Sequence, residues 1–441
     1  MAIIPQKQLF RWEEVEGLGD LARLRLVLSA LPDEPLMVAL EKERGHGRDD
    51  YPIRPMWNSL VAGVVFQHPS VAALRRELRR NPLLRWECGF DVLKGEAAVP
   101  PDWAVTRFLG SLVRHAEFLE AMFDRLVKEL RERLPGFGSV LAADGKGIPT
   151  HARPRPKDEK RPEPDGRRDL EADWGVKTRW KKRKDGTLYE QVTKWFGYKL
   201  HLMVDAIYEL PVAFEVTKAS ANEVPQTHGL VERLAERHPE VLKGCEAFVA
   251  DKGDDDTKLI TKLWDDHRIK PVIAIRDCWQ DGEKTHRVSN TRNVVYDYEG
   301  TVSCVCMRTG VQRKMAYAGF EATRGTLKYR CPARHYGVPC KSVERCPVRG
   351  AVRVKLTEDR RVFTPLARSS YAWKRTYAQR TAVERVNSRL DVSFGFERHF
   401  LRGQAKMRLR VGLALVVMLA MALGRIKQQQ QEALRCLVRA A

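Results

Sequence analysis

Apolar residues in the first part of the chain recur at the spacing of amphipathic helices. A leucine series at positions 21, 24, 28 and 31 stops before Pro32. Further helices are expected over 56–67 and over 71–80, the latter with Ser70 as its N-cap. A long amphipathic helix over 118–130 ends before Pro135-Gly136. Residues 1–136 are therefore predicted to be all-helical.

Two of these helices are separated only by His68-Pro69, and such a pair resembles a helix-turn-helix. Four arginines lie on adjacent turns of the second helix, opposite Leu74 and Leu78: Arg75, Arg76, Arg79 and Arg80. The cluster is either a DNA-binding surface or a solvated helix face. We expect residues 1–136 to bind DNA.

The pattern changes at Ser139, after which short apolar runs alternate with helical spacing. Strands are expected over 140–143, 198–206, 211–217, 247–250 and 271–275, with helices over 223–238 and 258–267. Asp144-Gly145 is expected to form a turn after the first strand. This order predicts an α/β sheet over 137–276. Residues 151–185, which have almost no aliphatic side chains, are expected to form a long exposed excursion.

The apolar pattern is weak over 277–365, which we interpret as an insertion into the sheet domain. Helices resume over 376–390 and through the apolar run 411–423, so residues 366–441 would complete the domain. That run has only 13 residues, whereas a bilayer requires about 20. It therefore predicts a buried core helix, and no membrane partner is expected.

The amino-acid composition indicates which partner the protein binds and in which compartment it is found. Lys and Arg number 78 against 57 Asp and Glu, a formal charge of +21, which favours nucleic acid first and an anionic membrane surface second. With 43% hydrophobic residues the chain is globular, not collagen-like, disordered or a disulfide scaffold. Nine cysteines and no evident secretion signal indicate a cytoplasmic, nucleoid-associated protein with reduced thiols.

Three acidic residues are candidates for catalysis. Asp144 and Asp251 each follow a short apolar strand and precede a glycine or a Lys-Gly pair. Glu384 ends the spacing Tyr377-x2-Arg380-x3-Glu384, which on one helix would place the three side chains on a common face. Carboxylates of this kind can hold two Mg²⁺ or Mn²⁺ ions for phosphoryl displacement, with Tyr377 and Arg380 binding the DNA backbone. Asp205, Asp255 and Asp256 are rival acids, the last two as caps of the next helix.

These motifs, together with Tyr198-Lys199-Leu200-His201, resemble in their order the DDE transposases of bacterial insertion sequences. The resemblance implies an RNase H-like mixed sheet flanked by helices, an acidic triad with Mg²⁺, and cutting and joining of double-stranded DNA at terminal inverted repeats and target sites. It also implies a homodimer on DNA.

Two positions depart from the family pattern, namely Asp391, where a lysine is usual, and Asp254, where an aromatic residue is usual. They favour one alternative, a DNA-binding protein that has lost catalysis. A stand-alone RNase H-like nuclease is a separate alternative.

Five cysteines gather in the insertion and suggest a structural zinc site. They are Cys304, Cys306, Cys331, Cys340 and Cys346. Their spacing is not that of two Cys-x2-Cys knuckles, and His335 adds a sixth candidate ligand. Unliganded thiols and a redox role are the alternatives.

Overall fold

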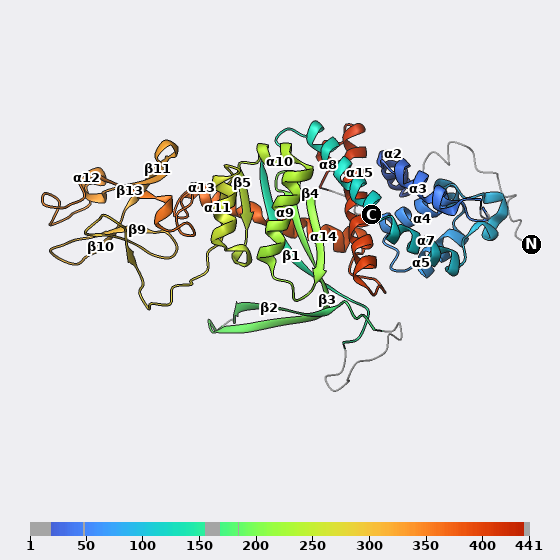
Figure 1. The fold of residues 1–441 in the computed structure, drawn as a ribbon, viewed down its shortest axis with the longest axis horizontal. Coiled ribbons are helices and arrows are strands. Elements are labelled where there is room, and N and C mark those ends of the chain that lie inside the picture. Colours follow the sequence, from blue (N-terminus) through green and yellow to red (C-terminus); the bar gives the residue numbers. More distant parts are fainter. Residues whose placement is uncertain (1–18, 47–48, 155–167, 184, 436–441) are drawn as a thin grey trace, which may run out of the picture. The chain divides into compact units, whose positions relative to one another are not determined.

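The computed structural model describes residues 19–46, 49–154, 168–183 and 185–435 (Figure 1). The chain divides into two compact units. The first comprises Met1–Arg133, Thr150–Leu170 and Ser388–Ala441, and the second comprises Leu134–Pro149 and Glu171–Asn387. Each is described by itself.

The first unit is helical, as its apolar spacing predicted. Its helices are α2 (Leu21–Ala30), α3 (Glu34–Arg44), α4 (Ile53–Val65), α5 (Val71–Arg80), α6 (Pro82–Cys88), η1 (Val92–Ala98), α7 (Asp102–Arg114), α8 (Ala116–Arg133), α15 (Gln404–Lys427) and η6 (Gln431–Ala433). The Ser70 hydroxyl accepts a hydrogen bond from the Ala73 N–H at 3.1 Å, which confirms the predicted cap of α5. Leu74 and Leu78 are buried beneath this helix, as expected.

Helix α15 contains the apolar run and packs against α2 and α8. Among the described residues it is the one helix long and apolar enough to cross a membrane, and 83% of its apolar window is buried. Burial of all residues from Val411 to Leu423 agrees with a core helix, because these side chains contact protein on all sides.

The second unit is built on a mixed six-stranded sheet. Its strands are β1 (Val140–Pro149), β2 (Asp173–Lys182), β3 (Leu188–Asp205), β4 (Leu210–Lys218), β5 (Ala247–Ala250) and β6 (Lys270–Ile273). The order is β2-β3-β1-β5-β6, and β4 also pairs with β3. Strands β1 to β4 pair antiparallel, whereas β5 is parallel to β1 and β6 is parallel to β5. The helices are α9 (Glu223–Arg237), α10 (Pro239–Gly244), η2 (Lys252–Asp254), α11 (Thr257–Asp265), α13 (Tyr371–Tyr377), η5 (Ala378–Arg380) and α14 (Thr381–Phe394), whose end belongs to the first unit.

Two local predictions in this unit are wrong. Asp144-Gly145 is not a turn, because β1 continues to Pro149 and pairs with β3 along its whole second half. The apolar run ends at Ala143 only because the second half of β1 leaves the fully buried core. Residues 173–182 of the predicted excursion form strand β2, which pairs with β3. Residues 155–167 and 184 of that excursion lie outside the described residues.

The insertion folds around an apolar cluster of its own, which includes Val294, Val302, Leu327, Tyr329 and Val354. Its strands are β7 (His286–Arg287), β8 (Val294–Tyr296), β9 (Val302–Val305), β10 (Gln312–Lys314), β11 (Ala316–Glu321), β12 (Thr326–Arg330) and β13 (Ala351–Lys355), with η3 (Ala322–Arg324), α12 (Pro332–Tyr336) and η4 (Leu356–Glu358). They form sheets in the orders β10-β9-β8-β7 and β11-β12-β13. Strands of two to six residues are too short to show a clear period in the sequence.

Candidate active site

Strand register brings the first two predicted acids together. In the parallel pair β1 and β5, Leu141 lies opposite Phe248 and Ala142 opposite Val249. Asp144 and Asp251 each lie two residues beyond the last paired residues of these strands, so both acids follow the same end of this parallel pairing. Burial raises the pKa of Asp144 to about 6; the charges of Asp251 and Glu223 act in the same direction, and Lys177 opposes them. The raised pKa therefore reflects mainly the burial of the Asp144 carboxyl, and the neighbouring acids add smaller contributions.

Glu223, at the first position of α9, is a site residue that the sequence analysis missed. A Cβ atom at Gly253 would lie 2.2 Å from Glu223 Oε2, and one at Gly145 would lie 2.8 Å from Glu223 Oε1. The glycines that follow Asp144 and Asp251 therefore leave the space that this carboxylate occupies. Lys199 Nζ lies 3.5 Å from Glu223 Oε1. The paired glycines were a visible signal that something approaches both backbones, but no local pattern identified Glu223.

Asp254 is a further buried acid in the same place. Its carboxylate accepts a hydrogen bond from the Thr227 hydroxyl at 2.6 Å. Burial raises its pKa to about 7, and the charges of Glu223, Asp251 and Asp144 add to the effect. The residue that departs from the family pattern is thus part of the acidic cluster.

The third predicted acid lies on a segment that contacts the same strands. The 3₁₀ turn η5 contacts both β1 and β5. Tyr377 ends α13, Arg380 belongs to η5 and Glu384 to α14, so the single continuous helix predicted for them is wrong. Arg380 still forms an ion pair with Glu384 at 2.8 Å, and its guanidinium lies 6.0 Å from the Tyr377 ring. Burial raises the pKa of Tyr377, Arg380 lowers it, and the charge of Asp251 raises it further, which places this side chain near the second acid.

The donor chemistry of this cluster suits a hard divalent cation, because all its candidate ligands are carboxylate oxygens. A divalent ion would also be attracted by the negative charges of Asp251 and Glu223, which contribute to the pKa shift of Asp144. Among the described residues, however, no group of three or more His, Cys, Asp or Glu side chains is arranged to hold a metal ion. Glu384, whose side chain is 49% exposed, is paired with Arg380.

A family model described as a transposase DDE domain matches residues 135–420, about two thirds of the chain. The chain belongs to this family. The match confirms the suspected DDE transposase family and the RNase H-like α/β class, with four antiparallel strands followed by two that pair in parallel. Membership of the transposase family identifies DNA as the substrate. No curated protein matches the chain.

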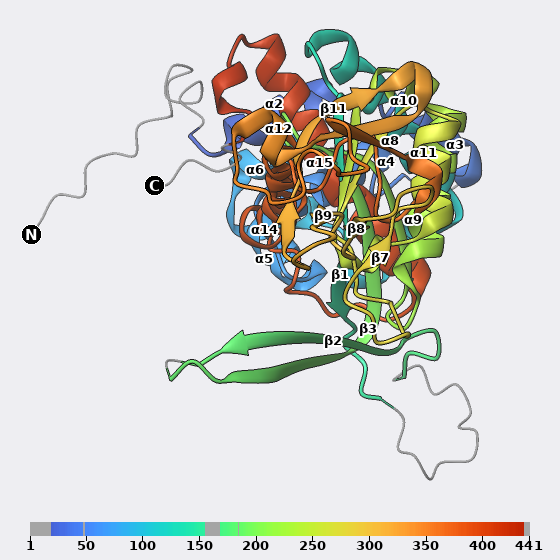
Figure 2. The same cartoon turned by 90° about the vertical axis from the view of Figure 1, so that its left-hand side faces the viewer.

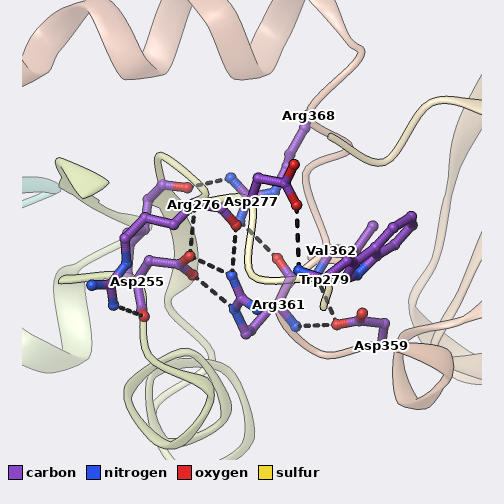
Figure 3. A network of polar contacts seen from close by, with 9 residues as sticks. Asp255, Arg276, Asp277, Trp279, Asp359, Arg361, Val362 and Arg368 are labelled. Atoms are coloured by element: carbon purple, nitrogen blue, oxygen red, sulfur yellow. Dashed lines mark hydrogen bonds and ion pairs between the residues drawn. The ribbon is translucent and has the colours of Figure 1, made fainter. Parts of the chain in front are cut away.

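The three rival acids have structural roles in this transposase. Asp205 is fully buried and accepts the Gly138 N–H at 2.8 Å and the Tyr208 N–H at 2.5 Å. Asp256 caps α11 through the Leu259 N–H, as expected. The capping role expected for Asp255 is wrong: its buried carboxylate binds Arg361 at 2.7 Å and the Arg276 N–H at 2.8 Å (Figure 3).

The four arginines predicted to form a surface on α5 differ in their exposure and in their ion-pair partners. Arg76 and Arg79 are exposed, and Arg80 pairs with Glu77 on the same helix. Arg75 is mostly buried, donates to the Pro100 carbonyl at 2.6 Å and pairs with Asp102. Arg75 is therefore bound within the protein, and DNA binding by the other three stays a prediction.

Within the described residues the insertion cysteines are not arranged to hold a metal ion, although four of them interact electrostatically. Burial raises the pKa of Cys304, and the thiols of Cys331, Cys346 and Cys340 add to this shift. Cys306 is held elsewhere, with its sulfur 3.2 Å from the Ser342 hydroxyl.

Proposed function

We propose that this protein cuts DNA at the ends of an insertion sequence and joins the freed 3′-hydroxyl to target DNA. The observation that supports the proposal is that Asp144 and Asp251 follow the parallel pairing of β1 and β5 at equivalent positions, within a partly buried acidic cluster. The finer parts of this function, including two metal ions, terminal inverted repeats and a homodimer on DNA, come from the family resemblance.

Asp144, Asp251 and Glu384 would hold two Mg²⁺ or Mn²⁺ ions, and Glu223 is a fourth candidate ligand. Such ions activate the attacking water or hydroxyl and stabilise the leaving oxygen. Arg380 and Tyr377 would bind the phosphate of the strand to be cut. Because Arg380 is paired with Glu384, the phosphate would compete with this carboxylate for the guanidinium.

The test compares Asp251→Asn with Asp256→Asn. Both substitutions remove one charge from the same loop, but Asn keeps the helix cap that Asp256 provides. The substrate is a supercoiled plasmid that carries the gene with its flanking DNA. Wild type and Asp256→Asn should nick it only with Mg²⁺ or Mn²⁺ present, and Asp251→Asn should be at least about a hundredfold slower.

Three results would contradict the proposal. Equal nicking rates for Asp251→Asn and Asp256→Asn would show that the acidic cluster does not catalyse DNA cutting. DNA binding by wild type without any cutting would favour a protein that has lost catalysis. Cutting without preference for the flanking DNA and without strand transfer would favour a stand-alone nuclease.

A structural zinc ion in the insertion is a separate proposal, with Cys304, Cys331, Cys340 and Cys346 as its ligands. The neighbourhood of these thiols supports it. Metal analysis of the purified protein should find one zinc per chain, unchanged by Cys278→Ser at an exposed cysteine and lost in Cys346→Ser. Absence of zinc from wild type would contradict it.

A further inference from the structure

Strands β2 and β3 form a two-stranded ribbon that leaves the sheet of the second unit (Figures 1 and 2). They pair from Asp173 opposite Gly197 to Lys182 opposite Leu188. Ten residues of strand span about 33 Å, close to one turn of B-form DNA. A two-stranded ribbon is marginally stable by itself, so a partner that covers its outer part would stabilise it.

The base of this ribbon is fixed relative to the strand that carries Asp144. The Trp195 indole covers two glycines: a Cβ atom would lie 2.3 Å from its ring at Gly175 and 2.7 Å from it at Gly147. Its Nε1 donates to the Tyr198 carbonyl at 2.9 Å. The Asp173 carboxylate accepts the Ser220 N–H at 2.8 Å. The ribbon therefore leaves the sheet in a direction set by β1, β2 and the loop after β4.

Basic side chains occur on both faces of the ribbon. Directly paired residues share a face, so Lys177 and Lys181 lie on one face and Lys182 and Lys194 on the other. Lys181, Lys182 and Lys194 are exposed. Residues 173–195 contain seven Lys and Arg against three Asp and Glu. A ribbon seated in a DNA groove runs between two phosphate backbones, which long lysine side chains from either face can reach.

Exposed apolar side chains lie between these charges. Trp174, Val176, Val192 and Leu188 are 51%, 58%, 45% and 67% exposed. Apolar side chains of a ribbon can contact thymine methyl groups at the floor of the major groove, which is wide enough to admit two strands. The positive charge on both faces favours DNA over a second copy of this chain, whose net charge is also positive.

We propose that the β2–β3 ribbon inserts into the major groove of the duplex next to the cleavage site. This proposal rests on the proposed function for the position of the cleavage site. That DNA is the substrate follows from the transposase family and does not depend on the proposed function. Lys177, whose charge acts on Asp144, marks the end of the ribbon that would lie nearest the bond to be cut.

The test measures binding to a fluorescent DNA duplex of about 30 base pairs, roughly three helical turns, in EDTA and at several salt concentrations. The double variant Lys181→Gln/Lys182→Gln removes two exposed charges, and Lys181→Arg/Lys182→Arg keeps them as a matched control. We expect the charge-removing variant to bind on the order of tenfold or more weakly near 0.1 M salt, with a salt slope smaller by about 2. The arginine control should keep the wild-type slope.

An unchanged slope in Lys181→Gln/Lys182→Gln would overturn the proposal. If Val176→Ser binds DNA as wild type does but its dimer dissociates, the ribbon would instead contact a second copy of this chain. Because binding in EDTA requires no catalysis, these results are independent of whether Asp251→Asn abolishes cutting. The two proposals can therefore fail separately.

Discussion

Replacement of Arg361 by Met should destabilise the second unit, because it leaves the Asp255 carboxylate buried without its cation. The Asp255 side chain is fully inaccessible and binds Arg361 Nη2 at 2.7 Å and Nε at 3.3 Å. Removing one partner of a buried ion pair costs about 3–5 kcal/mol. The Arg276 N–H remains at 2.8 Å and the Arg361 side chain is 21% exposed, so we expect about 2–3 kcal/mol.

Urea unfolding followed by tryptophan fluorescence measures this cost. The control is Arg353→Met, which breaks an ion pair with Glu321 on the surface of the insertion, where the arginine is 40% exposed. An exposed pair contributes about 0–1 kcal/mol. The variant Asp255→Asn/Arg361→Met should recover part of the loss, because the buried charge is then gone. If Arg361→Met costs no more than Arg353→Met, the buried pair does not hold the loop as argued.

Three further outcomes follow from the site. Gly253→Ala should slow cutting in a plasmid-nicking assay, since its Cβ would lie 2.2 Å from Glu223 Oε2 and displace this carboxylate; unchanged activity would show that the position of the Glu223 carboxylate does not matter for cutting. Gly229→Ala, with no atom within 4 Å in the middle of α9, should instead raise stability in urea by about 0.5–1 kcal/mol, and a loss would contradict the open space seen there. The pKa of Asp144 is raised to about 6, so the metal-free protein should lose stability as pH rises from about 4 to 6, and Asp144→Asn should reduce this loss; identical pH profiles would refute it.

Elements with a strong local signal were predictable from the sequence. Helix α5 has the expected bounds, because Ser70 caps its first turn and Asn81-Pro82 ends it. Strand β5 was predicted residue for residue, since four apolar residues bounded by polar ones can form a short buried strand. Helix α9 ends within one residue of its prediction.

Elements that depend on distant pairing were not predictable. Strand β2 and the second half of β1 have polar or mixed sequences, and only pairing with β3 makes them strands. The candidate site also combines residues with a local sequence signal and a residue placed only by tertiary packing. The glycines beside Asp144 and Asp251 marked both acids, but Glu223 lies on a helix that follows three further strands after β1. Its role depends on tertiary packing alone.

The insertion separates Asp251 from Glu384 by more than a hundred residues, yet a continuous set of contacts joins its end to the predicted third acid. Arg368, which is buried, donates to the Ile273 carbonyl at the end of β6 and to the Arg361 carbonyl (Figure 3). Its guanidinium lies 5.7 Å from the Trp373 ring, which stacks on Tyr377 at 4.8 Å.

Tyr377 in turn contacts Arg380, the partner of Glu384. Arg361 binds Asp255, four residues after Asp251, so Arg361 and Arg368 together hold both the loop of the second acid and the segment that leads to the third. The placement of Glu384 beside the sheet is thus set where the insertion rejoins the core, and a substitution there should alter the site without touching any of its acids.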